Sequence, residues 1–155
     1  MHSSWRDDIV SEARTWLGTK YHHKGRVKGV GVDCGGLIYE VFKKVMGIPC
    51  EPFPTVYAED WGLHRDDNEL YLNFIMPYVV PIAIPQLGDL VVFKFGRAYA
   101  HGSIYIGNNS VIHSYGRTGR GSVVISSLSK FNLGSGSRPQ KAFTLDDKWL
   151  SSQTL

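Results

Sequence analysis

The N-terminal part of the chain repeats its hydrophobic positions at helical spacing. These positions are Trp5, Ile9, Ala13 and Trp16. Ser4 precedes the pattern and Asp7 follows it by three positions, which is the arrangement of a capping box at a helix start. Gly18 supplies a stop signal. The pattern therefore predicts a first helix between Ser4 and Gly18.

A second helical pattern follows a glycine-rich connector, residues 24–31. Its apolar face consists of Leu37, Ile38, Val41, Phe42 and Val45. Asp33 is a natural N-cap residue, and Gly47 and Pro49 end the pattern. The second helix is therefore expected to run from Asp33 to Gly47, with Cys34 in its first turn.

From Gly88 onward the hydrophobic period changes to two, which is typical of half-buried strands. Strands are expected at residues 90–95, 102–106, 111–115, 122–126 and 142–145. Gly107, Asn108 and Asn109 give a hairpin signal between two of them. Helices followed by a run of antiparallel strands predict an α+β fold. In this fold the N-terminal helices would pack on a five- to six-stranded antiparallel sheet.

Residues 48–86 follow neither pattern. The stretch is rich in proline and aromatic residues, and residues 66–76 form a candidate short helix. A structureless loop of this length is uncommon inside a compact domain. We therefore expect an ordered insertion over a functional surface, within a single domain of residues 1–155.

Composition and charge narrow the range of functions. The chain has 17 Lys and Arg against 14 Asp and Glu, a formal charge of +3, and these basic residues form no run. We therefore expect no nucleic-acid partner. No apolar stretch is long enough for a membrane span, and no signal-peptide pattern is visible, so synthesis is expected in the cytoplasm. The two cysteines, Cys34 and Cys50, are typical of a reduced protein with one reactive thiol.

Cys34 is the strongest candidate for a nucleophile. The first turn of a helix presents unpaired N–H groups and a dipole, which lower the pKa of a thiol. Gly35 and Gly36 are poor helix formers, at up to about 1 kcal/mol each relative to Ala, so something is expected to approach the backbone closely here. The alternative interpretation is that Cys34 is a small buried hydrophobic residue.

Two of the six histidines, His101 and His113, stand on neighbouring predicted strands. A two-residue turn would point them to opposite sides of the sheet. A three-residue loop, Gly107 to Asn109, would place His113 opposite Ser103 and on the face of His101, at a diagonal of about 7–8 Å. We therefore predict the three-residue loop. His101 would then be the base for the thiol and His113 would hold its tautomer, although each histidine alone could be structural.

A metal site was the remaining alternative for this region. His22, His23 and Cys34 could act as ligands, but the sequence has no Cys-x-x-Cys or His-x-x-x-His spacing to support one. No metal and no cofactor are therefore expected.

Four motifs over residues 14–115 resemble the NlpC-type cell-wall cysteine peptidases. Gly-Thr-Lys-Tyr at residues 18–21 is similar to the family's Gly-Thr-Pro-Tyr, and Asp-Cys-Gly-Gly-Leu at residues 33–37 to its Asp-Cys-Ser-Gly-Leu. Residues 87–93 resemble its Gly-Asp-Leu strand. Residues 101–113 resemble its pattern of histidine, strand, turn and second histidine. The order and spacing of the four motifs make the resemblance specific.

The resemblance implies a papain-like fold with a triad of Cys34, His101 and His113. It implies hydrolysis of peptidoglycan stem peptides, typically between D-glutamate and diaminopimelate. Tyr21 would help bind the oxyanion with the Cys34 N–H, and Asp33 and Gly35 would complete the oxyanion and substrate-binding set. Such a donor is worth about 3–4 kcal/mol in other acyl-transfer enzymes. Because Gly35 replaces the usual serine, the stem-peptide preference stays open.

The aromatic segment suggests a subgroup within this family. Pro-Thr-Val-Tyr at residues 54–57 and Asp-Trp at residues 60–61 resemble the enzymes of tailed phages and gene transfer agents. That resemblance implies tail-tip partner proteins and action in the host periplasm or cell wall. Two alternatives stay open: a structural tail-tip protein whose peptidase site is vestigial or used only in assembly, and a thiol-dependent acyltransferase.

Overall fold

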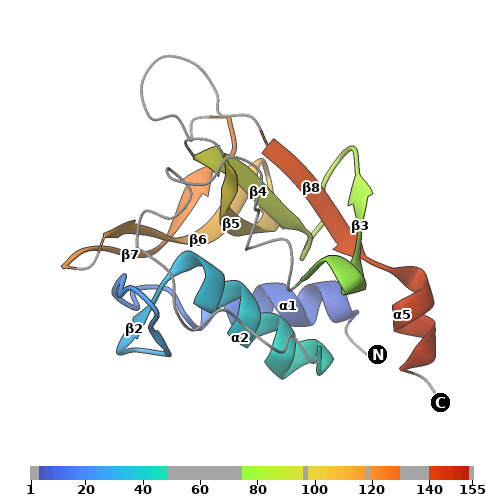
Figure 1. Ribbon diagram of the computed structural model, residues 1–155, viewed down its shortest axis with the longest axis horizontal. Coiled ribbons are helices and arrows are strands. Elements are labelled where there is room, and N and C mark those ends of the chain that lie inside the picture. The colour runs from blue at the N-terminus through green and yellow to red at the C-terminus, as the bar shows by residue number, and fades with distance from the viewer. Residues whose placement is uncertain (1–3, 49–74, 96–97, 118, 130–139, 154–155) are drawn as a thin grey trace.

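The computed structural model describes residues 4–48, 75–95, 98–117, 119–129 and 140–153. Two helices, α1 and α2, lie against one face of an antiparallel sheet (Figure 1). Both helices contact the sheet and each other. The predicted α+β architecture is therefore confirmed.

Helix α1 (Trp5–Arg14) begins where its capping box predicts. The Asp7 N–H donates to Ser4 Oγ at 3.3 Å, and Ser4 Oγ donates to the Asp7 carboxylate at 3.0 Å. The helix ends at the cap residue Thr15, before the predicted stop, and the backbone then turns at Gly18 with φ of +85°. The helix therefore ends at Thr15, and the change of chain direction follows at Gly18.

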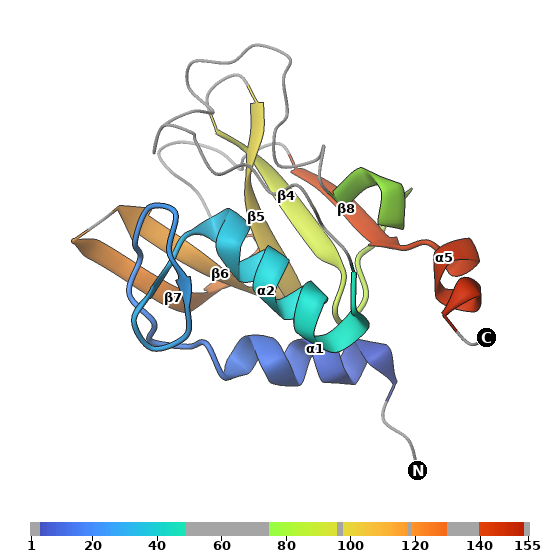
Figure 2. The same ribbon diagram turned by 60° about the horizontal axis from the view of Figure 1, so that its bottom comes forward.

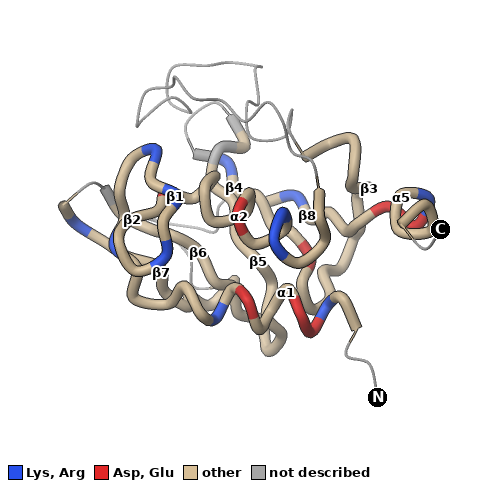
Figure 3. Tube along the Cα trace, turned by 90° about the horizontal axis from the view of Figure 1, so that it is seen from below, with Lys and Arg blue, Asp and Glu red and all other residues tan. Residues whose placement is uncertain are grey.

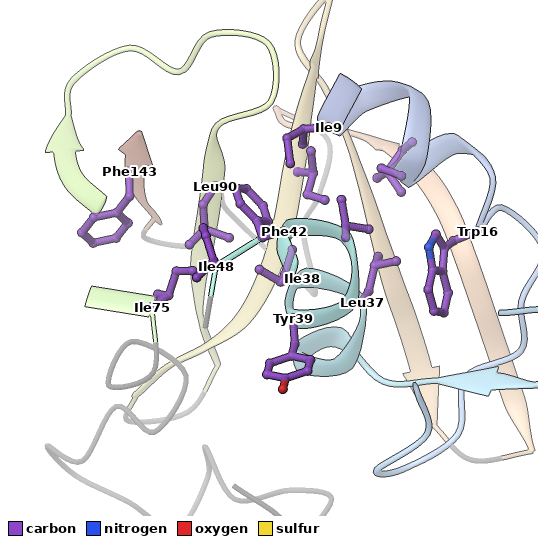
Figure 4. Packing of buried hydrophobic residues seen from close by; sticks show 14 of the residues in the cluster. Ile9, Trp16, Leu37, Ile38, Tyr39, Phe42, Ile48, Ile75, Leu90 and Phe143 are labelled. Atoms are coloured by element: carbon purple, nitrogen blue, oxygen red, sulfur yellow. The ribbon is translucent and has the colours of Figure 1, made fainter. Parts of the chain in front are cut away.

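Helix α2 (Cys34–Met46) has the predicted bounds because both of its caps form. Asp33 Oδ1 accepts the Gly36 N–H at 2.7 Å, and Gly47 closes the helix in the left-handed conformation with φ of 65°. Ile38 and Phe42 of α2 lie close to Leu90 of the sheet, in the same buried cluster (Figure 4). Burial of such a side chain contributes about 1.5–3 kcal/mol.

The main sheet has six strands in the order β3-β8-β4-β5-β6-β7, and every neighbouring pair is antiparallel. The strands are β3 (Val79–Ile82), β4 (Leu90–Phe95), β5 (Ala98–Gly107), β6 (Ser110–Arg117), β7 (Arg120–Ser127) and β8 (Gln140–Leu145). All five predicted strands are present, and four of them extend beyond their predicted ends.

Strand β3 was not predicted. It lies in the stretch assigned to the insertion, but it pairs with β8 at the edge of the sheet, preceded by a short 3₁₀ turn, η1 (Met76–Tyr78). Pro81 lies within it, and a proline is tolerated at an edge because it has no N–H to donate. Residues 79–82 therefore belong to the sheet and not to an insertion over it. The rest of the predicted insertion, residues 49–74, and with it most of the candidate helix at 66–76, lies outside the described residues.

The glycine-rich connector forms a small hairpin of β1 (Arg26–Val27) and β2 (Gly31–Val32). Figure 2 shows this hairpin beside the β6–β7 end of the sheet. Lys20 bridges Ser122 of β7 and Tyr21 bridges Val32 of β2, so residues 20–21 join the hairpin to the sheet. A last helix, α5 (Asp147–Ser152), follows β8.

Charged side chains connect α1 to its surroundings. Arg6 donates to Asp89 at 2.7 Å, to the Leu87 carbonyl at 2.9 Å and to Thr144 at 3.0 Å. Asp89 is buried and also accepts the Gln86 N–H at 2.8 Å. The aspartate of the Gly-Asp-Leu motif therefore fastens α1 to the sheet.

Basic residues occur on several elements, among them the β1–β2 hairpin and α2 (Figure 3). Two of them bind an acidic residue of α1: Lys28 and Lys44 lie 2.8 and 3.3 Å from the Glu12 carboxylate. In the part of the chain that the structure describes, no helix is long and apolar enough to cross a membrane.

Candidate active site

Cys34 is the first residue of α2, as predicted. The backbone N–H groups of Gly102, Gly35 and Cys34 itself lie close enough to its sulfur to lower the pKa of the thiol. Gly102 follows His101 on β5, so the thiol lies beside the strand that carries the candidate base. The start of α2 and the middle of the sheet thus meet at the sulfur.

The acidity of this thiol differs from the prediction. Burial, and after it the neighbouring Asp33 charge, raise the pKa of Cys34 to about 12, although three backbone N–H groups act in the lowering direction. The residue is nevertheless partly exposed to solvent. Helix-end donors are present as expected, yet burial outweighs them. The resting nucleophile is therefore a neutral thiol.

Asp33 has both carboxylate oxygens occupied by backbone donors. Besides the Gly36 N–H on Oδ1, the Lys24 N–H donates to Oδ2 at 2.9 Å, and the side chain is buried. An ionised carboxylate only accepts hydrogen bonds. Asp33 positions the nucleophile and ties it to the connector. Its predicted place in the oxyanion and substrate-binding set stays a prediction.

The two glycines after Cys34 have different roles. A Cβ on Gly36 would lie 2.5 Å from the Gly25 carbonyl oxygen, so the connector itself makes the close backbone approach that the sequence suggested. Gly35 is buried and its N–H points to the Cys34 sulfur. Its role in substrate binding stays a prediction.

The hairpin between β5 and β6 fixes the direction of the two histidines. Asn108 and Asn109 form a two-residue turn, closed where Gly107 lies opposite Ser110. Both asparagines have positive φ, 50° and 56°, which is typical of a type I′ turn. The register shifts between Tyr105 and Gly107, so β5 carries one extra residue as a bulge.

The predicted three-residue loop is therefore wrong, but the consequence drawn from it is confirmed. The bulge supplies the odd residue, and Ile104 pairs with Ile112, which places Ser103 opposite His113. His101 and His113 consequently lie on one face of the sheet, with His101 Nε2 at 2.7 Å from His113 Nδ1.

The second ring nitrogen of His113 contacts a further side chain. His113 Nε2 lies 2.7 Å from Ser126 Oγ on β7. His113 is fully buried and His101 is 5% exposed. Burial lowers the pKa of His113 to about 4, so this imidazole is neutral at pH 7. Because Nε2 of His101 faces His113, the nitrogen of His101 that can serve a thiol is Nδ1.

Aromatic rings surround the histidine pair. Tyr115 stacks on His113 with ring centroids 5.3 Å apart, and it meets the His101 ring edge-on at 5.7 Å. Phe93 lies opposite His101 on β4, with centroids 6.3 Å apart. These rings restrict rotation of both imidazoles. Sequence reasoning did not assign Tyr115 or Ser126 to the site.

The backbone of Tyr21 pairs with the segment that leads into Cys34. The residue is 9% exposed, its backbone bridges Val32 two residues before Cys34, and its N–H donates to the Gly121 carbonyl at 3.0 Å. Ser114, the neighbour of His113, donates to the Val32 carbonyl at 2.7 Å. The histidine strand and the nucleophile segment are thus directly connected, and the oxyanion role of Tyr21 stays a prediction.

Among the residues whose placement is described, no group of three or more His, Cys, Asp or Glu side chains could hold a metal ion. His22 is exposed, and its Nδ1 lies 2.9 Å from the neighbouring His23 carbonyl.

A thiol at a helix start, beside a strand that carries one of two paired histidines, is the arrangement of the papain-like class of α+β proteins. The profile of the NlpC/P60 family matches residues 18–132 of this chain. The chain therefore belongs to the NlpC/P60 family.

Relatives in sequence and structure agree with this assignment. The chain is 29% identical over 122 residues to the murein DD-endopeptidase MepS/murein LD-carboxypeptidase of Escherichia coli (strain K12), covering 79% of the chain and 54% of that protein. It is 32% identical over 132 residues to the gamma-DL-glutamyl hydrolase of Bacillus subtilis (strain 168), covering 83% and 27%. The chain thus spans about half of the first relative and about a quarter of the second.

The fold is similar to the crystal structure of the NlpC/p60 domain of the peptidoglycan hydrolase SagA. The TM-score is 0.59 at 21% identity, over 90% of this chain and 97% of that domain. At this level of identity the likeness concerns the fold alone.

Proposed function

We propose that this chain is a cysteine endopeptidase that hydrolyses peptidoglycan stem peptides, with Cys34 as nucleophile, His101 as base and His113 as the residue that orients the base. One observation carries the proposal. The two buried histidines are joined at 2.7 Å, and His101 lies on the strand whose Gly102 N–H is close to the Cys34 sulfur. A neutral thiol beside an imidazole that a second histidine orients can become a nucleophile as it reacts.

The mechanism begins with a neutral thiol because burial and the Asp33 charge raise the pKa of Cys34 to about 12. His101 Nδ1 takes the thiol proton as the sulfur attacks the scissile carbonyl carbon, and the Cys34 N–H and Tyr21 stabilise the oxyanion. Collapse of the tetrahedral intermediate breaks the C–N bond, and His101 gives its proton to the leaving amine. Water then attacks the thioester, with His101 as base, and releases the carboxylic acid and the thiol.

The substrate class rests on the relatives, which are named for action on murein or on gamma-glutamyl bonds. We place the scissile bond between D-glutamate and diaminopimelate. A DD bond between neighbouring stems, for which the E. coli relative is named, is the competing choice.

Purified muropeptides and mass spectrometry test this proposal. Wild-type protein, a Cys34→Ala variant and a Ser127→Ala control are incubated with monomeric and cross-linked muropeptides. Ser127 is a serine of β7 whose partners are Asn109 and Ser129, away from the site. Release of L-Ala-D-Glu by wild type and control, but not by Cys34→Ala, is the expected result.

Other outcomes discriminate the alternatives. Conversion of cross-linked dimers to intact monomers would reassign the bond to the DD type. Products that persist in Cys34→Ala would contradict the thiol mechanism. An inert wild type that still assembles into tail particles would favour the structural tail-tip role.

We also propose that the protein is part of a phage or gene-transfer-agent tail tip and acts in the host periplasm or cell wall after synthesis in the cytoplasm. This proposal rests on the sequence resemblance of residues 54–61, which lie outside the described residues. Mass spectrometry of purified particles tests it. The peptide should co-purify with tails in a constant ratio, and its absence from particles would contradict the assignment.

A further inference from the structure

Ser126 lies beside the histidine pair but is not one of the three residues proposed for the triad. It lies on β7 opposite Val111, whereas His113 lies opposite Val124. Ser126 and His113 are therefore diagonal neighbours on one face of the β6–β7 pair, and their side chains meet at 2.7 Å. Ser126 itself is half-buried.

The two hydrogen bonds of His113 are coupled through its tautomer. A neutral imidazole carries one proton, so one ring nitrogen donates and the other accepts. If the proton is on Nδ1, His113 donates to His101 Nε2, which places the remaining proton of a neutral His101 on Nδ1. That tautomer cannot take a proton from Cys34. If the proton is on Nε2, His113 accepts from His101 Nε2–H, and His101 Nδ1 keeps its lone pair.

Only the second arrangement gives a competent base, and it requires an acceptor at His113 Nε2. Ser126 Oγ is the side-chain atom that the structure places there. Burial of His113 strengthens the argument, since its lowered pKa of about 4 leaves a single proton to be distributed between two nitrogens at pH 7.

We propose that Ser126 is a positioning residue that accepts a hydrogen bond from His113 Nε2–H and thereby holds both histidines in the tautomers that leave His101 Nδ1 free to act as base. The proposal rests on the proposed function in naming His101 as the base. Its structural part, the proton on His113 Nε2, stands independently of any activity.

The first test measures the tautomer directly. The full-length protein is labelled with ¹⁵N-histidine, and long-range ¹H–¹⁵N spectra at pH 7 identify which ring nitrogen of His113 carries the proton, with a His113→Asn variant to assign the signals. The expected result is a proton on Nε2 in wild type and a shift toward Nδ1 in Ser126→Ala. A proton on Nδ1 in wild type would overturn the proposal.

The second test uses a matched pair of variants. Ser126→Thr keeps the hydroxyl, Ser126→Val has nearly the same shape without it, and both β-branched residues suit a strand. We expect Ser126→Val to lower kcat about three- to tenfold at unchanged KM, the factor of one net neutral hydrogen bond. Ser126→Thr should retain kcat within about twofold. Equal kcat values for the two variants would contradict the proposal.

The two tests separate this inference from the proposed function. If wild type cleaves muropeptides but Ser126→Val changes neither the tautomer nor kcat, the role of Ser126 is wrong and the peptidase stands. If wild type is inert but its His113 proton is on Nε2 and moves in Ser126→Val, the tautomer role holds and the peptidase proposal fails.

Discussion

Strands β4 to β6 bury side chains on both of their faces, but the two faces are held in place differently. On the helix-covered face, Leu90 pairs with Ile104, and both belong to the apolar cluster shared with α1 and α2. On the opposite face, Phe93 pairs with His101, and His113 follows on the next strand. The helix-covered face is stabilised by removal of apolar surface from water, and the other face by a smaller apolar cluster around Val91 and Phe93 together with partnered polar groups.

The difference shows how one set of strands serves both folding and chemistry. Because side chains alternate, Ile112 and His113 are neighbours in sequence yet belong to different faces. On the apolar face, a smaller side chain leaves a cavity that lowers the free energy of unfolding. On the histidine face, the cost comes from burying a ring nitrogen without a hydrogen-bond partner. Changes on the two faces should therefore have separable effects on stability and on turnover.

The largest effect should come from His101→Gln. The variant keeps a polar side chain of similar length on the histidine face but removes the base, so turnover of stem peptides should fall by about 10²–10⁴. The free energy of unfolding should change much less than for a core truncation. A steady-state assay with thermal unfolding measures both quantities. Turnover within about threefold of wild type would remove His101 from the mechanism.

On the helix-covered face, Ile112→Ala should destabilise the protein by about 2–5 kcal/mol, since Ile112 is fully buried in the apolar cluster. Its strand neighbour Ile125 is 45% exposed and provides the matched control. Ile125→Ala should cost well under 1 kcal/mol. Urea unfolding measures both. Because Ile125 lies on the same face, equal losses in the two variants would show that burial in the apolar cluster is not what makes Ile112 stabilising.

Acid should weaken the histidine face specifically. The pKa of His113 is lowered by burial to about 4 from an unfolded value of 6.5, so the unfolded chain binds a proton over this window and the native state does not. Stability is therefore complete above about pH 6.5 and lost as the pH falls towards 4, by roughly 3 kcal/mol in total. Urea unfolding across this pH range should show the loss in wild type.

The His113→Asn variant is the control for this acid effect. Its unfolding free energy should lack that part of the pH dependence, because asparagine does not titrate. Parallel pH profiles for wild type and variant would mean that His113 titrates normally in the native protein.

Two smaller effects should follow from Asp33→Asn: the thiol should become more reactive and the protein less stable. Loss of the negative charge removes one cause of the raised pKa of Cys34, so the thiol pKa should fall and its alkylation by iodoacetamide at pH 8 should accelerate. The amide oxygen can cap only one of the two N–H groups, Gly36 or Lys24, which should cost about 1 kcal/mol. An unchanged pH profile of alkylation would contradict the electrostatic role.

The sequence predicted best the helix whose capping residues lie directly at its two ends. Helix α2 has the expected bounds because Asp33 and Gly47 cap it, and the strands follow from their alternation. Strand β3 was not predicted because it contains Pro81, and a proline argues against a strand unless that strand lies at the edge of a sheet. The bulge in β5 depends on pairing with β6, so it could not be read from the turn residues alone.

The candidate site was predictable in its residues and less so in its energetics. Cys34, His101 and His113 stood out by residue type and spacing. The rise in the thiol pKa was not foreseen, because it depends on burial by segments distant in sequence. Ser126 resembled any strand serine until its distance to His113 was known.

The most direct test of the account is whether the reactivity of Cys34 depends on His101. A stem peptide carrying a C-terminal chloromethyl ketone is incubated with wild type and with His101→Gln, and intact-mass spectrometry with peptide mapping follows the adduct. We predict one adduct on Cys34 in wild type and labelling at least about 100-fold slower in His101→Gln. Equal labelling rates in the two proteins would contradict the central claim that the thiol and the histidine pair work as one unit.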